Sequence, residues 1–519
     1  MNRAYQKYAI IEGKLFTFAK TIEPAISKAS SRIVICAHEG SERYIAEEQW
    51  IERSERFTKE ASKLGIVTSQ SSAQAKIALF RSLFKGRTDV HAHGFKRKDG
   101  GIGYAPACAN EWRRGVCPRA GGTKVKCSSC DLRSFLPLTD ADIVNHFKGC
   151  DARFRDVLGL YVLGNDSHTS VLIMDFDKSK WKEEVTAIRS ASESHGIRVC
   201  VERSRSGNGG HIWFFFEQPV DAKLARDFGN VLIDEAMSES KSISFDAYDR
   251  MFPAQTSIPE GGFGNLISLP LQGSARKRGN SLFVNERFEP YPDQWLFLSK
   301  VRKLSEQQLR DVIYGRTSHP KNESKLGDTT TQSEATASET RLRTSTMPLS
   351  SSDFSDHLII IESDMIYLPE ASLGPKAESR IKRLAAFANP EFFRAQAMHQ
   401  SVYGKQRVIF LGENRGESLA LPRGCKQKLL NVLNAANANY TVADKRTTGR
   451  QLKVEFTGTL RPEQHRAVQE LLRYDNGILS APTGFGKTVI GAYLISQLHV
   501  SALVLVPRTA LISQWAKRF

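Results

Sequence analysis

The spacing of apolar residues predicts a sheet covered by helices from residue 157 to residue 239. LGLYVLG and SVLIMDF are rich in β-branched and aromatic residues and predict strands, as do IRVCVE and GHIWFFF further along. Residues 180–195 and 222–239 repeat apolar residues at helical spacing. The order β-β-α-β-β-α therefore predicts an α/β or α+β domain with helices packed on a sheet.

The flanking regions give shorter patterns. Residues 1–67 predict short strands (YAIIEGKLF, RIVICAH) and a helix (EEQWIERSERFTKEASKLG), a small α/β region without recognisable chemistry. Residues 316–352 hold 16 Ser or Thr among 37 residues and no aromatic residue, which predicts a disordered linker. Residues 377–393 and 426–435 predict helices. From residue 460, a helix, the strand GILS, a glycine loop, a helix and the strand ALVLVP predict the start of a parallel sheet.

Composition narrows the class of protein. The chain has 519 residues, 40% hydrophobic and 25% charged, so it is neither fibrous nor wholly disordered. The net charge of +17 favours a polyanion partner, most simply nucleic acid. Eight cysteines make no disulfide scaffold, and we expect a cytoplasmic protein. The sequence shows no apolar run long enough to span a bilayer, so we expect no membrane partner.

A pair of carboxylates marks the first candidate site. Asp175 and Asp177 are two residues apart on the predicted strand VLIMDFD, so both side chains face one side. Neighbouring carboxylates repel unless a cation lies between them, and Mg²⁺ or Mn²⁺ prefers oxygen ligands. Two such ions can promote phosphoryl transfer. The alternative is a pair of solvated acids at a strand end.

A glycine loop follows and ends in a histidine. Glycines allow backbone N–H groups to approach an anion closely, so His211 and this loop can bind a nucleotide phosphate. The alternatives are a hairpin turn and a buried core histidine. Further on come Asp246, Asp249 and a basic cluster. The predicted phosphate-binding set is Ser206, Gly207, Asn208, Gly209, Gly210, Arg203, Arg205, Arg276 and Lys277.

Four cysteines crowd a short segment before this region. Cys108, Cys117, Cys127 and Cys130 have the spacing C-x8-C-x9-C-x2-C, and four thiolates can close a tetrahedral structural zinc site. The alternative is four unrelated thiols. His146 and Cys150 are spare ligand candidates.

Near the end of the chain, APTGFGKT lies between a predicted strand and a predicted helix. Backbone N–H groups and the helix N-terminus cradle phosphates in such loops, the lysine reaches the β- and γ-phosphates, and the threonine binds Mg²⁺. The predicted ATP-binding residues here are Thr483, Gly484, Gly486, Lys487 and Thr488.

Residues 70–310 resemble the primase–polymerase domain of the archaeo-eukaryotic primase superfamily, in the branch found in TOTE conflict systems. The shared stretches are ALFRSLFKGR, GYAPACANEW, FLPLTD, MDFD, ERSRSGNGGHIWFFF, YDRMFP, GGFGNLISLPLQ and PYPDQW. The resemblance implies an RRM-like core preceded by the cysteine module. It also implies that Asp175, Asp177 and Asp249 hold the catalytic metals, with Asp246 as an alternative, and that His211 contacts the incoming nucleotide. Arg276 or Lys277 then holds triphosphate or template.

Residues 456–519 resemble the start of a superfamily 2 helicase, through A-x-T-G-x-G-K-T, LRPEQHRAVQELL and LVLVPRTALISQW. By that resemblance Gln464 reads adenine, Arg461 contacts the nucleotide, and residues 353–455 are a pre-helicase region. The sequence contains neither a D-E-x-H/D motif nor a second motor lobe. We therefore expect this chain to bind ATP but to hydrolyse little of it. We expect it to be a fragment, the product of a split gene, or a protein that a second chain completes. A nuclease is expected as a further partner.

Together these features predict a template-dependent nucleotidyltransferase on single-stranded DNA, which uses NTP or dNTP, Mg²⁺ or Mn²⁺ and structural Zn²⁺. A role in defence is implied by the resemblance alone. Two alternatives remain: an ATP-driven translocase whose primase-like domain only clamps nucleic acid, and a non-enzymatic binding module.

Overall fold

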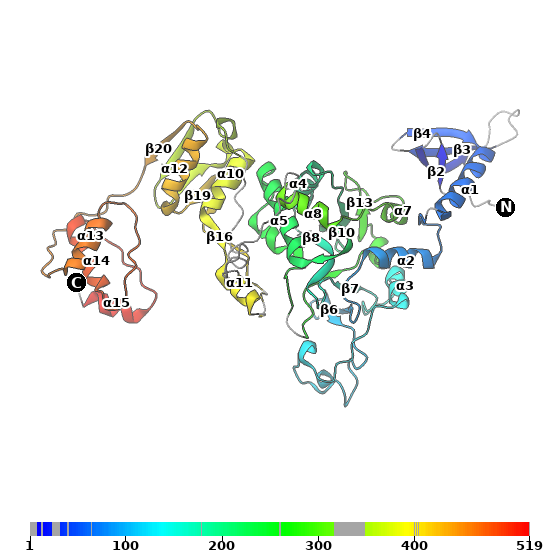
Figure 1. Ribbon diagram of the computed structural model, residues 1–519, viewed down its shortest axis with the longest axis horizontal. Helices are drawn as coiled ribbons and strands as arrows, with labels where there is room; N and C mark the ends of the chain where they lie inside the picture. The colour runs from blue at the N-terminus through cyan, green and yellow to red at the C-terminus, as the bar shows by residue number, and fades with distance from the viewer. Residues whose placement is uncertain are drawn as a thin grey trace, which may run out of the picture. The chain divides into compact units, whose positions relative to one another are not determined.

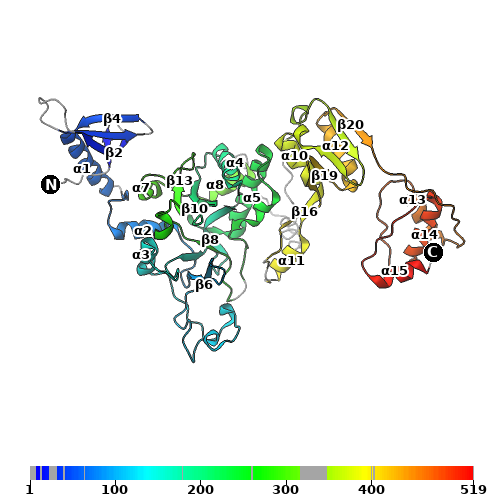
Figure 2. The same cartoon turned by 180° about the vertical axis from the view of Figure 1, so that it is seen from behind.

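The computed structural model describes residues 8–11, 14–22, 32–38, 41–63, 65–177, 179–258, 261–315, 348–398, 400, 402 and 404–517. The chain divides into two compact units, seen from opposite sides in Figures 1 and 2. One consists of Met1–Thr340 with Asn389–Arg407, and the other of Arg341–Ala388 with Val408–Phe519. Most of the predicted linker, residues 316–347, lies outside the described residues. Its last residues enter a short 3-10 helix, Ser351–Asp353.

The N-terminal region of the first unit is an antiparallel sheet with one helix. Its four strands pair in chain order, and Ala9, Phe16, Val34 and Trp50 form its core. The predicted strands and helix are confirmed, whereas the fourth strand was missed because its outer residues are exposed and polar. The elements are β1 (Tyr8–Ile11), β2 (Lys14–Ile22), β3 (Ile33–His38), β4 (Ser41–Ala46) and α1 (Glu47–Lys63).

The next region is built on a five-stranded antiparallel sheet in the order β11-β8-β10-β9-β13. Helices α4 and α5 pack on this sheet, and α8 packs on α5 (Figure 1). All four strand predictions between residues 157 and 216 and both helices are confirmed, within a few residues. The elements are β8 (His168–Asp177), α4 (Trp181–Ser194), β9 (Cys200–Arg203), β10 (Gly209–Asp221), α5 (Ala222–Glu239), β11 (Met251–Phe252), β13 (Leu282–Val284) and α8 (Glu306–Tyr314).

A second sheet, in the order β12-β7-β5-β6, completes this region. Its Leu158 and Leu160 share a core with Ile173 and Trp213 of the first sheet and with Phe84. The predicted single β-β-α-β-β-α sheet differs from the structure because β7, which is buried throughout, pairs with β5 and β12 rather than β8. The elements are α2 (Ala73–Leu83), β5 (Ala92–Lys96), β6 (Ile102–Pro106), α3 (Asp140–Lys148), β7 (Leu158–Tyr161), β12 (Leu266–Ser268), α6 (Gly273–Arg276) and α7 (Gln294–Ser299).

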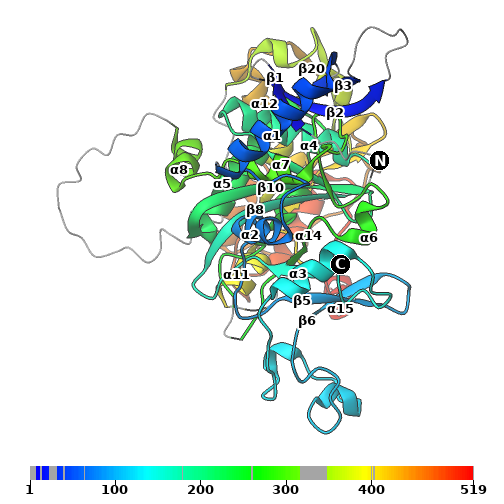
Figure 3. The same cartoon turned by 90° about the vertical axis from the view of Figure 1, so that its right-hand side faces the viewer.

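The cysteine-bearing segment between β6 and α3 projects from the β5–β6 hairpin (Figure 3). Its regular structure consists of two short 3-10 helices, Pro118–Gly121 and Cys127–Ser129. A segment with so little backbone pairing needs another source of rigidity, and a metal clip is one such source.

The second unit contains a five-stranded sheet in the order β18-β19-β15-β14-β20, in which β14 and β20 are parallel. The helix predicted at 426–435 is confirmed. The helix predicted at 377–393 is wrong, because Pro390 starts a new helix and disfavours helical backbone at Asn389. The elements of this unit are β14 (Leu358–Glu362), β15 (Ile366–Pro369), α10 (Pro375–Lys382), β16 (Ala386–Ala388), β17 (Val408–Phe410), β18 (Glu413–Arg415), β19 (Ser418–Leu421), α12 (Lys426–Ala435) and β20 (Tyr440–Asp444). Helix α11 (Pro390–Ala397) lies in the segment that belongs to the first unit.

The C-terminal residues form three helices, α13 (Pro462–Leu471), α14 (Lys487–Leu498) and α15 (Thr509–Ala516). The predicted strands GILS and ALVLVP are not formed, which corrects the prediction of a parallel sheet. Parallel strands are stable when neighbouring strands and helices cover them. Here Ile478 is 96% exposed and Leu503 84% exposed, so the described residues leave much of these stretches uncovered. No described helix combines the length and the apolar character needed to cross a membrane.

Candidate active site of the first unit

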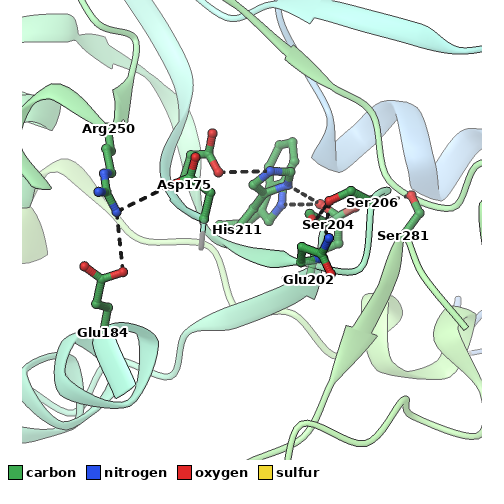
Figure 4. A network of polar contacts seen from close by, with 11 residues as sticks. Asp175, Glu184, Glu202, Ser204, Ser206, His211, Arg250 and Ser281 are labelled. Atoms are coloured by element: carbon green, nitrogen blue, oxygen red, sulfur yellow. Dashed lines mark hydrogen bonds and ion pairs between the residues drawn. The ribbon is translucent and has the colours of Figure 1, made fainter. Parts of the chain in front are cut away.

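Three side chains form a row across the first sheet. In the register of the strands, His211 on β10 lies opposite Asp175 on β8 and opposite Glu202 on β9. Because directly paired residues share a face of the sheet, the three side chains meet (Figure 4). His211 Nδ1 is 2.8 Å from Glu202 Oε2, and His211 Nε2 is 3.4 Å from Asp175 Oδ1. The predicted proximity of the acid and the histidine is therefore a direct consequence of strand pairing.

Glu202 was not among the predicted site residues, yet it anchors the row. Its side chain is 1% exposed, and it also accepts hydrogen bonds from Trp213 Nε1 at 3.1 Å and Ser281 Oγ at 3.3 Å. A buried carboxylate is costly unless it is paired and hydrogen-bonded, so these three donors explain its burial. The one feature of the sequence that could have pointed to Glu202 is its place as the acid that ends the apolar strand IRVCVE.

The row carries a cation between two anions. Burial alone lowers the pKa of His211, but the carboxylates of Glu202 and Asp175 outweigh it and raise its pKa to about 10. Burial raises the pKa of Asp175, but the hydrogen bond and charge of His211 prevail, so its pKa is lowered. The imidazole of His211 is therefore held as an imidazolium, and its two N–H groups point at the carboxylates of Glu202 and Asp175. Of these two acids, Asp175 is the predicted metal ligand.

Asp177 lies at the end of β8 on the same face as Asp175, and its carboxylate is largely exposed. Its cross-strand partner is Gly209. A Cβ at Gly209 would lie 2.6 Å from the Phe176 carbonyl oxygen, and one at Gly210 would lie 2.6 Å from the Trp181 ring. These glycines are needed for close packing, and Gly209 leaves the space opposite Asp177 without a side chain. Arg250 Nη1 lies 3.8 Å from Asp177 Oδ1.

Asp249 ends a 3-10 helix, Phe245–Asp249, just before the edge strand β11. The next residue is close to the row, since the Arg250 carbonyl accepts the Asp175 N–H at 2.9 Å. The Asp249 carboxylate itself accepts the backbone N–H of Arg407 at 3.0 and 3.3 Å. Burial raises the pKa of the Asp249 carboxyl. The Arg407 N–H and charge oppose this rise but do not cancel it. Asp246, the alternative, is exposed.

The structure thus brings Asp175, Asp177 and His211 together and directs Asp249 toward Arg407. In the ranges that the structure describes, no three acidic, histidine or cysteine side chains are gathered closely enough to hold a metal ion. The donor set still matches Mg²⁺ or Mn²⁺ in chemistry: hard carboxylate oxygens on one strand face, with room opposite Asp177.

The glycine loop is the hairpin turn that joins β9 to β10. Gly207 has φ +87°, its N–H donates to the Ser204 carbonyl at 3.0 Å, and Asn208 N–H donates to Ser206 Oγ at 3.3 Å. The hairpin and phosphate-binding interpretations are compatible, because this turn borders a hollow of about 580 Å³. A volume of this order suits a small ligand. The hollow is lined by Ser179, Trp181, Lys182, Arg203, Gly207, Asn208 and Asn280.

The predicted basic residues divide into two kinds. Arg203 donates to the carbonyls of Gly279 at 3.0 Å and Phe288 at 2.6 Å, and Arg276 donates to Phe147 at 2.8 Å, so both already brace the fold. Arg205 is half-buried and Lys277 is exposed. Nucleotide contacts by these four side chains remain predictions, and Lys277 is the most accessible of them.

The four predicted zinc ligands line one cavity of about 30 Å³ together with Trp112 and Arg119. Cys108 Sγ accepts the Ser134 N–H at 3.4 Å, and Arg119 donates to Cys127 Sγ at 3.4 Å. The slight burial of Cys117 raises its pKa, but nearby backbone N–H groups outweigh this and lower it. Such donors stabilise thiolates, the form that binds zinc.

The spare candidates do not join this cavity. His146 is fully buried, with its ring nitrogens 2.9 and 3.0 Å from the carbonyls of Asp156 and Pro270, so it is a core histidine. Cys150 is exposed and lies outside the cavity of the four cysteines.

In the second unit, the phosphate-type loop begins α14 at Gly486, which has φ +90°. Lys487 Nζ donates to the carbonyls of Ala481 at 2.7 Å and Pro482 at 2.9 Å. Gln464 Nε2 and Arg461 Nη2 donate to the Phe485 carbonyl at 2.7 and 2.6 Å. Arg461 and Gln464 thus contact the loop that carries the predicted ATP-binding residues, and nucleotide contacts by all of these residues remain predictions.

Comparison with known proteins identifies both regions. Residues 75–312 match the family model "TOTE conflict system, Archaeo-Eukaryotic Primase domain", and residues 457–519 match "Type III restriction enzyme, res subunit". The predicted helicase 109L of Invertebrate iridescent virus 3 is 34% identical over 100 residues, 18% of this chain and 30% of that protein. The DNA 3'-5' translocase XPB2 of Sulfurisphaera tokodaii is 41% identical over 59 residues, 11% of this chain and 13% of that protein.

The chain therefore spans less than a third of the length of these curated relatives. A solved structure, the polymerase domain of Mycobacterium tuberculosis ligase D in complex with DNA, aligns at 13% identity. It covers 47% of this chain and 86% of that chain, with a TM-score of 0.23. Residues 75–312 are therefore similar to an archaeo-eukaryotic primase domain, and residues 457–519 are similar to a helicase-like domain.

Proposed function

We propose that this nucleic-acid-processing enzyme is a template-dependent primase–polymerase that uses NTP or dNTP. The observation that carries the proposal is the row of Asp175, His211 and Glu202 across three adjacent strands, with Asp177 beside it. A buried ion-paired histidine next to two carboxylates is costly to build. Strongly perturbed groups of this kind concentrate at functional sites.

In the proposed reaction, the 3′-oxygen of a primer or an initiating nucleotide forms a bond to the α-phosphorus of the incoming nucleotide. The bond from that phosphorus to the bridging oxygen breaks, pyrophosphate leaves with that bonding pair, and the hydroxyl proton passes to solvent water. Asp175, Asp177 and Asp249 would hold the divalent metals. Bound Mg²⁺ or Mn²⁺ supplies activation of the hydroxyl and stabilisation of the leaving oxygen.

The protein's own residues orient the nucleotide. The imidazolium of His211 offers positive charge to phosphate oxygens, and Glu202 fixes the ring through Nδ1. The hollow bordered by Trp181, Lys182 and Asn208 supplies a basic and aromatic wall for the remainder of the nucleotide. Lys277, Arg205, Arg203 and Arg276 are proposed to contact triphosphate or template strand.

Primer extension tests the proposal. A labelled primer on single-stranded DNA is incubated with nucleotides and Mg²⁺ or Mn²⁺, with wild type and Asp175→Ala compared at equal concentration. Wild type should add the nucleotide complementary to the template, and the variant should not. Equal extension by both proteins, or no extension by wild type with either metal and either sugar, contradicts the proposal.

The cysteine segment is proposed to bind one structural Zn²⁺ through Cys108, Cys117, Cys127 and Cys130. Their shared cavity and the N–H groups directed at Cys117 and Cys108 support this assignment. The Arg119 guanidinium lies over the Trp112 ring, 5.0 Å from its centroid. We propose that this pair offers a basic and aromatic surface to the template strand.

A second activity, ATP binding by residues 457–519, is favoured by the packing of Gln464 and Arg461 against the phosphate-type loop. Thr483, Gly484, Gly486, Lys487 and Thr488 would hold the phosphates, and Thr488 the Mg²⁺. A role in defence is a further proposal, which rests on the matched primase family. A cytoplasmic location, which rests on the low cysteine content, and a second chain that completes a motor are also proposed. We also propose the domain borders expected from the sequence: residues 1–67, 70–310, 316–352, 353–455 and 456–519.

A further inference from the structure

A segment far along the chain reaches back to the proposed active site. Asn389–Arg407, hereafter the arm, lies between the paired strands β16 and β17 of the second unit but belongs to the first unit. Helix α11 forms its first half. The arm's last residue, Arg407, contacts Asp249, 158 positions earlier in the sequence.

The arm holds the loop that carries Asp249 by three kinds of contact. The Arg407 backbone N–H donates to both Asp249 oxygens, at 3.0 and 3.3 Å. The Arg407 guanidinium donates to the Ala254 carbonyl. Gln396 Nε2, on α11, donates to Thr256 Oγ1 at 3.2 Å.

Arg407 is itself fixed in place. Its guanidinium lies over the Phe392 ring, 4.3 Å from the centroid, and its carbonyl accepts the Asn389 N–H at 2.7 Å. The side chain of Arg407 is mostly buried. An arginine stacked on a ring and bonded at both ends is a rigid support rather than a chance surface contact.

The opposite side of the loop is tied to the sheet domain. Arg226 of α5, 3% exposed, donates to the carbonyls of Tyr248 at 3.0 Å and Pro253 at 2.6 Å. The Asp249 loop is therefore clamped between two arginines, one from the primase-type domain and one from the arm. Arg226 fixes the backbone, while only the arm reaches the carboxylate of Asp249 among the hydrogen bonds of the described residues.

We infer that the arm is a positioning element of the polymerase site, which orients the Asp249 carboxylate through the Arg407 N–H. This inference rests on the proposed function and deepens it. Hydrogen bonds to a ligating carboxylate fix its orientation, and their loss typically costs about 10–100-fold in metal affinity or activity.

Three variants of the full chain separate the parts of this inference. Arg407→Pro removes the N–H that binds Asp249, since proline has no amide hydrogen. Arg407→Ala keeps that N–H and removes the guanidinium. Arg394→Ala, at an exposed arginine of α11, is the matched control.

A fourth variant removes the arm altogether. Ala388 pairs with Val408, so residues 389–407 leave and return at adjacent points and can be replaced by an Asn-Gly hairpin turn.

Two measurements are made on each variant: the rate of primer extension, and the Mn²⁺ concentration that half-saturates dNTP binding. We expect Arg407→Pro and the arm replacement to slow extension by about 10–100-fold and to raise the Mn²⁺ requirement by a similar factor. Arg407→Ala should have a smaller effect, and Arg394→Ala should match wild type. Wild-type behaviour of Arg407→Pro, or faster extension after arm replacement, overturns the inference. Faster extension would make the arm a brake.

A double-variant cycle shows whether the arm acts through Asp249. If it does, Arg407→Pro should add little to the loss caused by Asp249→Asn, whereas independent losses multiply. Amide hydrogen exchange of residues 245–256 provides a readout without catalysis, and Arg407→Pro should speed it at least about 10-fold. If wild type does not extend primers, the proposed function fails. Exchange then still decides whether the arm holds this loop, and unchanged exchange overturns that claim.

Discussion

The acid–histidine row of the first unit and the phosphate-type loop of the second differ in what holds them. Asp175, His211 and Glu202 lie on three paired strands, with Trp213 and Ser281 completing the bonds of the buried acid. Lys487 bonds to the carbonyls of its own loop, and the apolar stretches on either side of that loop are exposed. One site is built by the pairing of three strands, and the other is a loop held by its own lysine and by Arg461 and Gln464. Long-range pairing therefore makes the first site the better candidate for catalysis by these residues.

The largest expected effect is on the first site alone. Asp177→Asn removes the charge of a largely exposed carboxylate whose ion pair with Arg250, at 3.8 Å, is long, so the fold should be little affected. Loss of a metal ligand removes several kcal/mol of charge stabilisation, so primer extension should fall about 1,000-fold. ATP-analogue binding by the same protein should not change. A parallel loss of both activities would show that the two sites are not separate.

The reciprocal change is Lys487→Ala. It removes the charge that the loop offers to phosphate, so the affinity for an ATP analogue should fall by about 10–100-fold. Extension at saturating dNTP should stay within about twofold of wild type. Titration of a fluorescent analogue measures the first quantity. Unchanged affinity would contradict an ATP site at this loop.

Glu202→Gln tests the buried anchor of the row. The amide keeps the shape but places donors where His211 and Trp213 also donate, so we expect extension about 10-fold lower and unfolding easier by about 1–3 kcal/mol. Glu217→Gln, on the exposed end of the neighbouring strand β10, is the control and should change neither quantity. Equal behaviour of the two variants would remove Glu202 from the site.

The smallest expected effect is in the cysteine segment. Cys127→Ser should lower bound zinc from about one per chain to well below one and lower the thermal midpoint by about 5 °C. Cys150→Ser, at an exposed thiol outside the cavity, should leave zinc content unchanged. Zinc content by atomic emission checks both variants. Full zinc in Cys127→Ser would contradict the assignment.

The sequence predicts local features of this fold well. The strands around Asp175 and His211 follow from their β-branched and aromatic residues, because both are buried along most of their length. The helix Ala222–Glu239 follows from its periodicity, because it buries one stripe of apolar residues. Whether β7 would join the sheet of β8 depends on distant partners, and no local pattern specifies it. GILS and ALVLVP are apolar enough for strands, but a strand also needs a neighbour to pair with.

The site shows the same division. Asp175, Asp177 and His211 are recognisable from their motifs, and the structure places them together. Glu202 and Arg407 are not recognisable, because their importance comes from contacts with residues distant in the sequence. Glu202 looks like an ordinary strand-end acid, and Arg407 lies 158 residues beyond the carboxylate that it holds.

The central claim, that the row is a nucleotide site, is tested most directly by dNTP binding in a Lys487→Ala background, where the second phosphate site is silenced. Binding of a labelled dNTP is measured with and without Mn²⁺, and with and without the additional change Asp175→Ala. The account predicts Mn²⁺-dependent binding that the Asp175 change abolishes. Binding that ignores both Mn²⁺ and Asp175, or no binding at all, would contradict it.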